Sequence, residues 1–256
     1  MNHLIKRGLT TFDLKILGIT LMVIDHIHQM FVPFGVPDWV DWFGRPVATI
    51  FFFVSVIGFT HTHSKKQYML RLYCAMVLMS LFTFALEKIV SYEQVILMNN
   101  IFRDLFVGTM MMAGIDLIKS GIKPKKISRL LAGISVFSLP LLFSLLIPLL
   151  FATPQTIPFV LPFLPALLLA ENTVMVLLIP LLYWFKGNRK VQCLLIAVTA
   201  AIYFFLGSTQ WIMVFAIIPI WLYNGQKGNG MKYFFYIFYP AHIAVLYIVS
   251  AWLFQR

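Results

Sequence analysis

The sequence predicts an all-α polytopic integral membrane protein, and three observations support this fold class. Of its 256 residues, 61% are hydrophobic and only 11% are charged, and the mean hydropathy is +0.88. A soluble domain carries about a quarter charged residues. The apolar residues form long runs, and short basic clusters separate these runs. Because lipid must solvate most of such a surface, residues 1–256 are expected to form a single membrane domain.

The lengths of the apolar runs and the helix breakers between them predict nine to ten transmembrane helices. Nine full spans are expected at residues 13–33, 45–62, 71–90, 95–118, 129–151, 172–186, 191–206, 209–224 and 233–254. Residues 157–170 are apolar but short, and Pro158, Pro162 and Pro165 interrupt them. This segment is predicted to be re-entrant or half-length, and it accounts for the tenth element.

The net charge is +11. The distribution of the basic residues along the chain predicts its orientation in the membrane and argues against a nucleic-acid partner. Lys and Arg recur in short clusters between apolar runs, as membrane topology requires. With a cytoplasmic N-terminus in the cell (plasma or inner) membrane, 16 of the 20 basic residues lie inside. Only Arg45, Lys88, Arg103 and Arg256 then fall outside.

The first predicted span carries ionisable residues, which are costly at membrane depth and indicate function. Lys15 and His26 are 11 residues apart, about three turns plus roughly 20°, so they share one helix face about 16 Å apart. That separation matches the reach of an extended pantetheine arm. Lys15 is therefore predicted to bind a phosphate of coenzyme A, and His26 to meet the thioester. Asp25 can meet His28 or Gln29 one turn on, and Asp25 or His28 is predicted to orient the His26 ring.

Further polar residues are predicted at similar depth in other spans. Arg45 begins the second span and is a candidate for oxyanion stabilisation. A substrate cavity that opens outward is predicted from Asn99, Asn100, Arg103, Asp104 and His242. Arg103 and Asp104 have an equally good explanation as structural partners of other helices. No metal site is expected, since His61 and His63 have no nearby carboxylate or Cys.

Three segments resemble the TraX family of membrane proteins. They are LKILGITLMVIDHIHQMF (14–31), WFGRPVATIFFFVSVIGF (42–59) and YFFYIFYPAHIAVLY (233–247). The resemblance covers most of the chain and implies a role in conjugation, through acetylation of the N-terminal amine of F-type pilin. More distantly, Lys15, ten residues and then His26 resemble a motif of the type-3 membrane acyltransferases. In that family the His is essential for acyl transfer, and the resemblance assigns this role to His26.

The residues and the resemblance together predict an acetyltransferase that uses cytoplasmic acetyl-CoA. His26 is expected to act as general base toward an amine or hydroxyl of a membrane or extracytoplasmic acceptor. The acceptor is either a pilin-like peptide N-terminus or an envelope glycan. A proton-coupled transporter also needs intramembrane His, Asp and Arg, but it would predict inverted repeats, which the sequence lacks. A non-catalytic membrane assembly protein would tolerate loss of Lys15 and His26.

Overall fold

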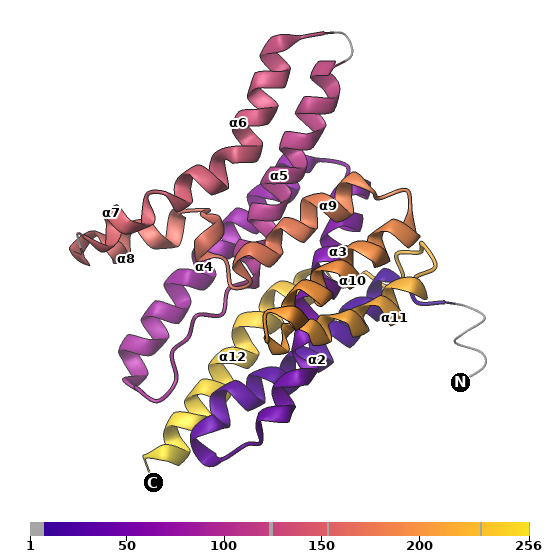
Figure 1. The fold of residues 1–256 in the computed structure, drawn as a ribbon. Coiled ribbons are helices and arrows are strands. Elements are labelled where there is room, and N and C mark those ends of the chain that lie inside the picture. Colours follow the sequence, from indigo (N-terminus) through magenta and orange to yellow (C-terminus); the bar gives the residue numbers. More distant parts are fainter. Residues whose placement is uncertain (1–7, 123–124, 153, 231, 256) are drawn as a thin grey trace. The chain divides into compact units, whose positions relative to one another are not determined.

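The computed structural model describes residues 8–122, 125–152, 154–230 and 232–255, and the helices of these ranges are joined by turns and extended loops (Figure 1). The longer helices are α2 (Thr11–Phe31), α3 (Arg45–His61), α4 (Lys65–Val90), α5 (Ile101–Ile122), α6 (Ile127–Ser144), α10 (Arg189–Phe205) and α12 (Lys232–Phe254). The shorter ones are η1 (Val32–Phe34), η2 (Asp38–Phe43), α7 (Ile147–Phe151), η3 (Pro154–Thr156), α8 (Ile157–Val160), η4 (Leu161–Phe163), η5 (Leu167–Leu169), η6 (Thr173–Leu177), α9 (Leu178–Trp184), η7 (Thr209–Ala216) and α11 (Ile217–Trp221). Of the residues that predicted the orientation, Lys6, Arg7, Lys123 and Arg256 lie outside the described ranges.

Six helices of the described chain are long and apolar enough to cross a membrane. They span Thr11–Phe34, Asp38–His61, Lys65–Val90, Ile101–Ile122, Ile127–Phe151 and Tyr233–Phe254. The fold class is therefore confirmed, but nine to ten spans are not. The predicted spans at 172–186, 191–206 and 209–224 fold as helical stretches of 12, 17 and 13 residues. These fall short of the roughly 20 residues that cross a bilayer unaided.

The chain divides into two compact units. Unit 1 comprises Met1–Val54, Phe82–Leu97 and Asn188–Arg256, and unit 2 comprises Ser55–Leu81 and Met98–Gly187. Helices α3 and α4 each contribute residues to both units.

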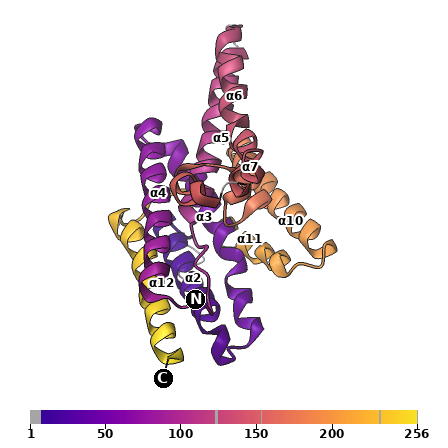
Figure 2. The same cartoon turned by 90° about the vertical axis from the view of Figure 1, so that its left-hand side faces the viewer.

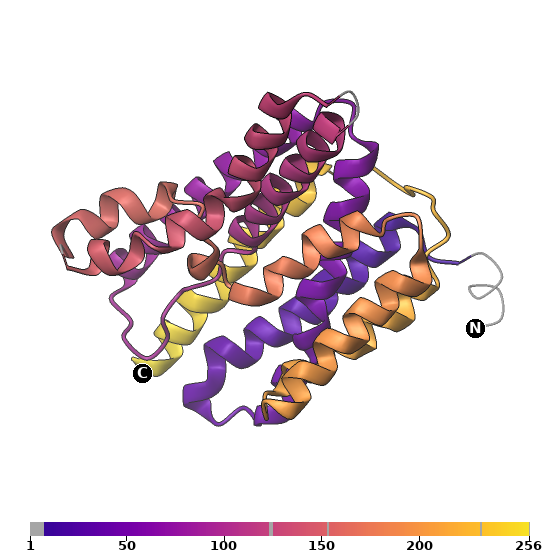
Figure 3. The same cartoon turned by 45° about the horizontal axis from the view of Figure 1, so that its top comes forward.

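In unit 1, α2 packs against α12 and against η2, and α10 lies beside η7 and α11 (Figure 3). A capping box begins α2, because Thr10 N donates to Asp13 Oδ2 (2.8 Å) and Asp13 N donates to Thr10 Oγ1. Val32 after α2 keeps helical backbone angles and leads directly into η1, and Gly35 ends this turn with a positive φ of 80°.

In unit 2, α5 and α6 form an antiparallel pair that lies side by side in two views (Figures 1 and 2). Two glycines allow this close approach. A Cβ at Gly114 would lie 2.8 Å from Phe137 N, and one at Gly133 would lie 2.6 Å from Ile118 N. Small residues at such crossings are typical of helix packing within membranes.

The segment from 157 to 170 folds as short helical pieces, in agreement with the break that its prolines predict. The Arg103 guanidinium donates to the carbonyls of Leu161 (2.9 Å) and Leu169 (3.1 Å). The Asp104 carboxylate accepts from the backbone N–H groups of Glu171 (2.7 Å) and Asn172 (3.1 Å). Non-helical backbone at membrane depth requires such protein partners. The entry of this segment into a membrane stays a prediction.

Candidate functional site

The candidate site is a pair of histidines where α2 and α12 meet in unit 1. His26 on α2 is 2% exposed, and its Nδ1 lies 2.7 Å from Nε2 of His242 on α12. The two rings are nearly parallel, with an interplanar angle of 7° and centroids 4.9 Å apart. Residues 216 positions apart in the sequence are thus joined by one hydrogen bond.

The contacts of His242 assign the proton positions of the pair. Its Nδ1 lies 2.8 Å from the Phe238 carbonyl oxygen, which can only accept, so this Nδ1 carries the hydrogen. In a neutral imidazole the other nitrogen then accepts, and His242 Nε2 takes a hydrogen bond from His26 Nδ1. His26 Nε2 is therefore the unprotonated nitrogen, and it has the lone pair that a general base needs.

Aromatic rings hold the histidine pair in place. Phe238 stacks on His242 with centroids 4.9 Å apart, and Tyr239 presents its ring edge to His26 at 6.1 Å. Phe238 and Tyr239 precede His242 by four and three residues, so they share its side of α12.

Lys15 lies toward the start of α2, and α12 contributes the ring beneath it. Its Nζ is 4.7 Å from the centroid of Phe235, within the range of a cation–π contact. Lys227 is close enough to interact electrostatically with Lys15. Phe235 precedes His242 by seven residues, almost two full turns. The helices α2 and α12 therefore run in the same direction, with the cations at one end of their contact and the histidines farther along it.

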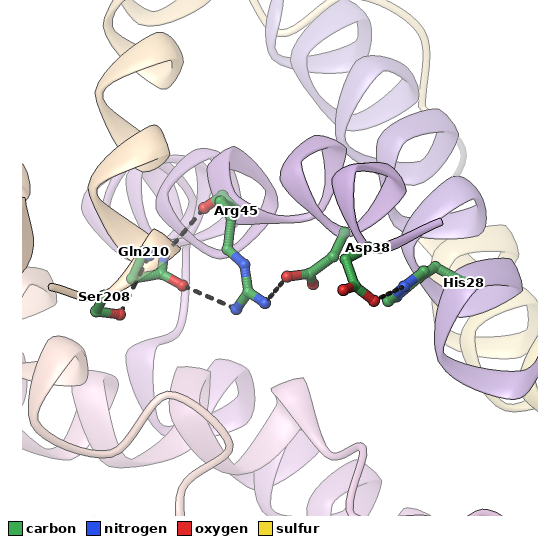
Figure 4. A network of polar contacts seen from close by, with 6 residues as sticks. His28, Asp38, Arg45, Ser208 and Gln210 are labelled. Atoms are coloured by element: carbon green, nitrogen blue, oxygen red, sulfur yellow. Dashed lines mark hydrogen bonds and ion pairs between the residues drawn. The ribbon is translucent and has the colours of Figure 1, made fainter. Parts of the chain in front are cut away.

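The other polar residues predicted on the first two spans contact residues 38–45. His28 Nε2 is 4.0 Å from Asp38 Oδ1 (Figure 4). The Asp25 side chain lies directly against Gly44, where no Cβ could fit. Residues two apart on a helix do not face each other, so His28 points away from the side of α2 that holds His26. The ring of His26 contacts His242 in the structure, and the orienting role that the sequence predicts for Asp25 or His28 stays a prediction.

Arg45, predicted to stabilise an oxyanion, belongs to a network at the start of α3. Its guanidinium pairs with Asp41 and donates to Gln210 Oε1 at 3.4 Å (Figure 4). Gln210 Nε2 in turn donates to the Arg45 carbonyl at 3.1 Å. Arg45 thus ties η2 and α3 to η7, and its catalytic role stays a prediction.

The residues predicted to line one substrate cavity divide between the two units. His242 is in unit 1, whereas Asn99, Asn100, Arg103 and Asp104 are in unit 2, where all four are buried. Asn100 Nδ2 donates to the Met76 carbonyl (2.9 Å) and to Ser80 Oγ (2.8 Å). Together with the contacts above, this favours the structural alternative for Arg103 and Asp104. The shared cavity stays a prediction.

Two features of the site were not deduced from the sequence. One is the direct partnership of His242 with His26, and the other is the second cation, Lys227, near Lys15. Residue spacing gives a sequence signal for the partnership of His242 with His26. Phe235 and His242 lie on one face of α12, and Lys15 and His26 lie on one face of α2.

The fold and the site define a polytopic helical membrane protein in which a buried histidine, His26, is hydrogen-bonded to a half-buried one, His242. The sequence profile of the TraX protein family matches residues 11–250. The chain therefore belongs to the TraX family. Neither the proteins of curated function nor the solved structures include a significant match to it.

Proposed function

We propose that the chain is a membrane-bound acetyltransferase that moves an acetyl group from cytoplasmic acetyl-CoA to an amine or hydroxyl acceptor. The observation that carries the proposal is the His26–His242 hydrogen bond, which supports a proton-accepting role for His26 Nε2. Membership of the TraX family supports the same proposal, because the resemblance to this family implies acetylation of a pilin N-terminus.

In the proposed reaction, His26 Nε2 takes the proton from the acceptor nitrogen or oxygen as that atom attacks the thioester carbonyl. A carbon–nitrogen or carbon–oxygen bond forms, and the carbonyl oxygen becomes an oxyanion. Collapse of this intermediate breaks the carbon–sulfur bond, and the coenzyme A thiolate takes the proton back from His26. His242 stabilises the imidazolium through the hydrogen bond to Nδ1.

Lys15 and Lys227 would hold a phosphate of coenzyme A. Both are cations at the same end of the α2–α12 contact, and they repel each other until an anion lies between them. Along α2, Lys15 and His26 are separated by about 16 Å, which an extended pantetheine arm spans. The acceptor would be the N-terminal amine of a pilin-like peptide or a hydroxyl of an envelope glycan.

We also propose nine crossings of the cell membrane, with the N-terminus in the cytoplasm. If only the six long helices crossed, Lys186, Arg189 and Lys190 would fall outside, against the positive-inside rule. The pieces from α8 to α9 would form one discontinuous crossing, whose freed backbone Arg103 and Asp104 satisfy. Helices α10 and η7–α11 would make the next two.

The direct test of donor use is to incubate the purified chain in detergent with radiolabelled acetyl-CoA. The proposal expects saturable binding and slow release of labelled acetate when no acceptor is present. Excess unlabelled coenzyme A should displace the label. Absence of both binding and hydrolysis in a folded preparation would contradict the use of acetyl-CoA.

A further inference from the structure

Unit 1 contains an apolar groove of about 500 Å³ that is separate from the histidine pair. Its walls are apolar side chains of α2, η2, the first turns of α3, η7 and α11. Leu17 and Leu21 line it from α2, and His26 lies five residues beyond Leu21, about 140° around the helix. The groove therefore faces away from the candidate catalytic residues.

Most residues of the network in Figure 4 are close neighbours in sequence of residues that line the groove. Trp42 and Phe43 line the groove between Asp41 and Arg45 of this network, and Ile212 lines it two residues after Gln210. Gln210 joins the walls by its two hydrogen bonds with Arg45. At this end Asp41 pairs with the Arg45 guanidinium, and the fully exposed Asp38 carboxylate lies 4.0 Å from His28 Nε2.

The aromatic residues place this end of the groove at a membrane interface. Trp39 and Trp42 line the groove yet are 54% and 52% exposed. Trp side chains concentrate at the level of lipid headgroups. From there, the groove follows α3 from Pro46 to Ile50 toward the hydrocarbon core.

We propose that the groove binds an acyl chain of a zwitterionic aminophospholipid. The ammonium of the headgroup would lie beside Asp38, and its phosphate beside Arg45. Because Asp41 already pairs with Arg45, the exposed Asp38 carboxylate is the charge that repels an anionic headgroup and attracts the ammonium of a zwitterionic one. This inference does not depend on the proposed acetyl transfer.

The walls of the groove suit an acyl chain, because nearly all of their surface is apolar. Its volume is within the 300–1,000 Å³ that ligand pockets typically enclose. A lipid bilayer supplies acyl chains at high concentration to a groove that opens at the surface of the chain.

The test is native mass spectrometry of the delipidated full chain in detergent. Equal amounts of phosphatidylethanolamine and phosphatidylglycerol with identical chains are added together. The wild type should retain phosphatidylethanolamine with a preference of roughly two- to fivefold, the range that an exposed ion pair gives. Asp38→Asn should abolish this preference and still retain lipid, and it changes only an exposed side chain.

A second pair of variants tests the groove itself. Leu21→Trp fills the groove and should reduce retention of both lipids at least about tenfold, because the buried apolar contact is lost. Val245→Trp is the matched control, since Val245 is 60% exposed on α12 and does not line the groove. Circular dichroism establishes that each variant is folded.

Three results would overturn the inference. One is equal lipid retention by the wild type and folded Leu21→Trp, and another is a preference for phosphatidylglycerol. The third is a wild-type dimer that Leu21→Trp dissociates, which would make the groove an interface between copies. If Leu21→Trp does not fold, an unchanged preference in Asp38→Asn is enough to reject the headgroup assignment.

Discussion

At the scale of single residues, His242 determines which nitrogen of His26 can accept a proton. Its Nδ1–H donates to the Phe238 carbonyl, so its Nε2 must accept from His26. This makes His242 a positioning residue, because its proposed effect on the acceptor passes through His26. The two histidines therefore predict different kinetic consequences when each is replaced.

Replacing His242 should lower turnover without weakening acetyl-CoA binding. His242→Phe removes the acceptor for His26 Nδ1–H, and we expect kcat to fall at least about tenfold, but less than removal of the base itself. His242→Gln supplies an amide oxygen and should restore part of the rate. Initial rates at varied acetyl-CoA concentration give kcat and KM separately, and only kcat should change. A wild-type kcat in His242→Phe would remove His242 from the mechanism.

Replacing Lys15 should weaken acetyl-CoA binding. Lys15→Ala removes one of two cations and should raise Kd roughly tenfold, as expected for a hydrogen bond to a charged group. Lys15→Arg should largely keep the affinity, and the difference should shrink at high salt. Lys88→Ala is the matched control, because Lys88 also lies over a ring, that of Phe84. Equal affinity for acetyl-CoA in the wild type and Lys15→Ala would contradict phosphate binding by Lys15, which would then only be a cation at the membrane interface.

At the scale of elements, the broken segment from 157 to 170 and the two residues after it depend on α5. Asp104 is fully buried and accepts three hydrogen bonds, from Glu171 N, Asn172 N and Asn172 Nδ2. Arg103 donates to two carbonyls of the same segment and to Ser80 Oγ. These contacts replace the backbone hydrogen bonds that a continuous helix would have made.

Removing the Asp104 carboxylate should destabilise unit 2 strongly. Asp104→Ala removes the acceptor of three hydrogen bonds at a fully buried position, each worth about 1 kcal/mol, so a loss of roughly 3 kcal/mol is expected. Thermal unfolding in detergent measures the effect. Glu93→Ala changes an exposed carboxylate and should leave the unfolding temperature unaltered. If both variants unfold at the wild-type temperature, Asp104 does not hold the segment.

The long helices could be predicted because twenty-residue apolar runs have few other structures available to them. The start of α5 was predicted at residue 95, but the helix begins at Ile101. Asn100 explains the difference, since its Oδ1 accepts from Arg103 N as an N-cap does. Hydropathy alone could not show that 172–186 and 209–224 fold as short helices. An apolar run that crosses a membrane and one that packs inside the protein have the same hydropathy pattern.

Half of the candidate site could be predicted from helix periodicity. Lys15 and His26 fall on one face of α2, and that requires only the helical repeat. The partner of His26 could not be derived in the same way, because His242 is on a helix 216 residues away. Only the packing of α2 against α12 brings the two rings together, and Asp25 and His28 face residues 38–45 instead.

At the scale of the whole molecule, the number of crossings decides which side each loop occupies. Nine crossings place Lys126 and Lys190 in the cytoplasm and put residues near Asp38 and the C-terminus outside. Six crossings would instead place Lys190 outside and the C-terminus inside. Reporter fusions at these four positions distinguish the two topologies. A cytoplasmic signal at the C-terminus would contradict nine crossings, and an external signal at Lys126 would overturn the orientation.

The central claim is that His26 is the general base of an acetyl transfer. His26→Gln keeps a polar side chain of similar size but cannot take up and return a proton, so the loss should approach the typical 10²–10⁴-fold contribution of a general base. The decisive measurement is acetyl transfer to an amine acceptor by purified His26→Gln, with His28→Gln as the matched variant. We predict that His26→Gln inserts normally and binds acetyl-CoA but transfers almost nothing, while His28→Gln loses less. Transfer by His26→Gln at more than about a tenth of the wild-type rate would contradict the claim.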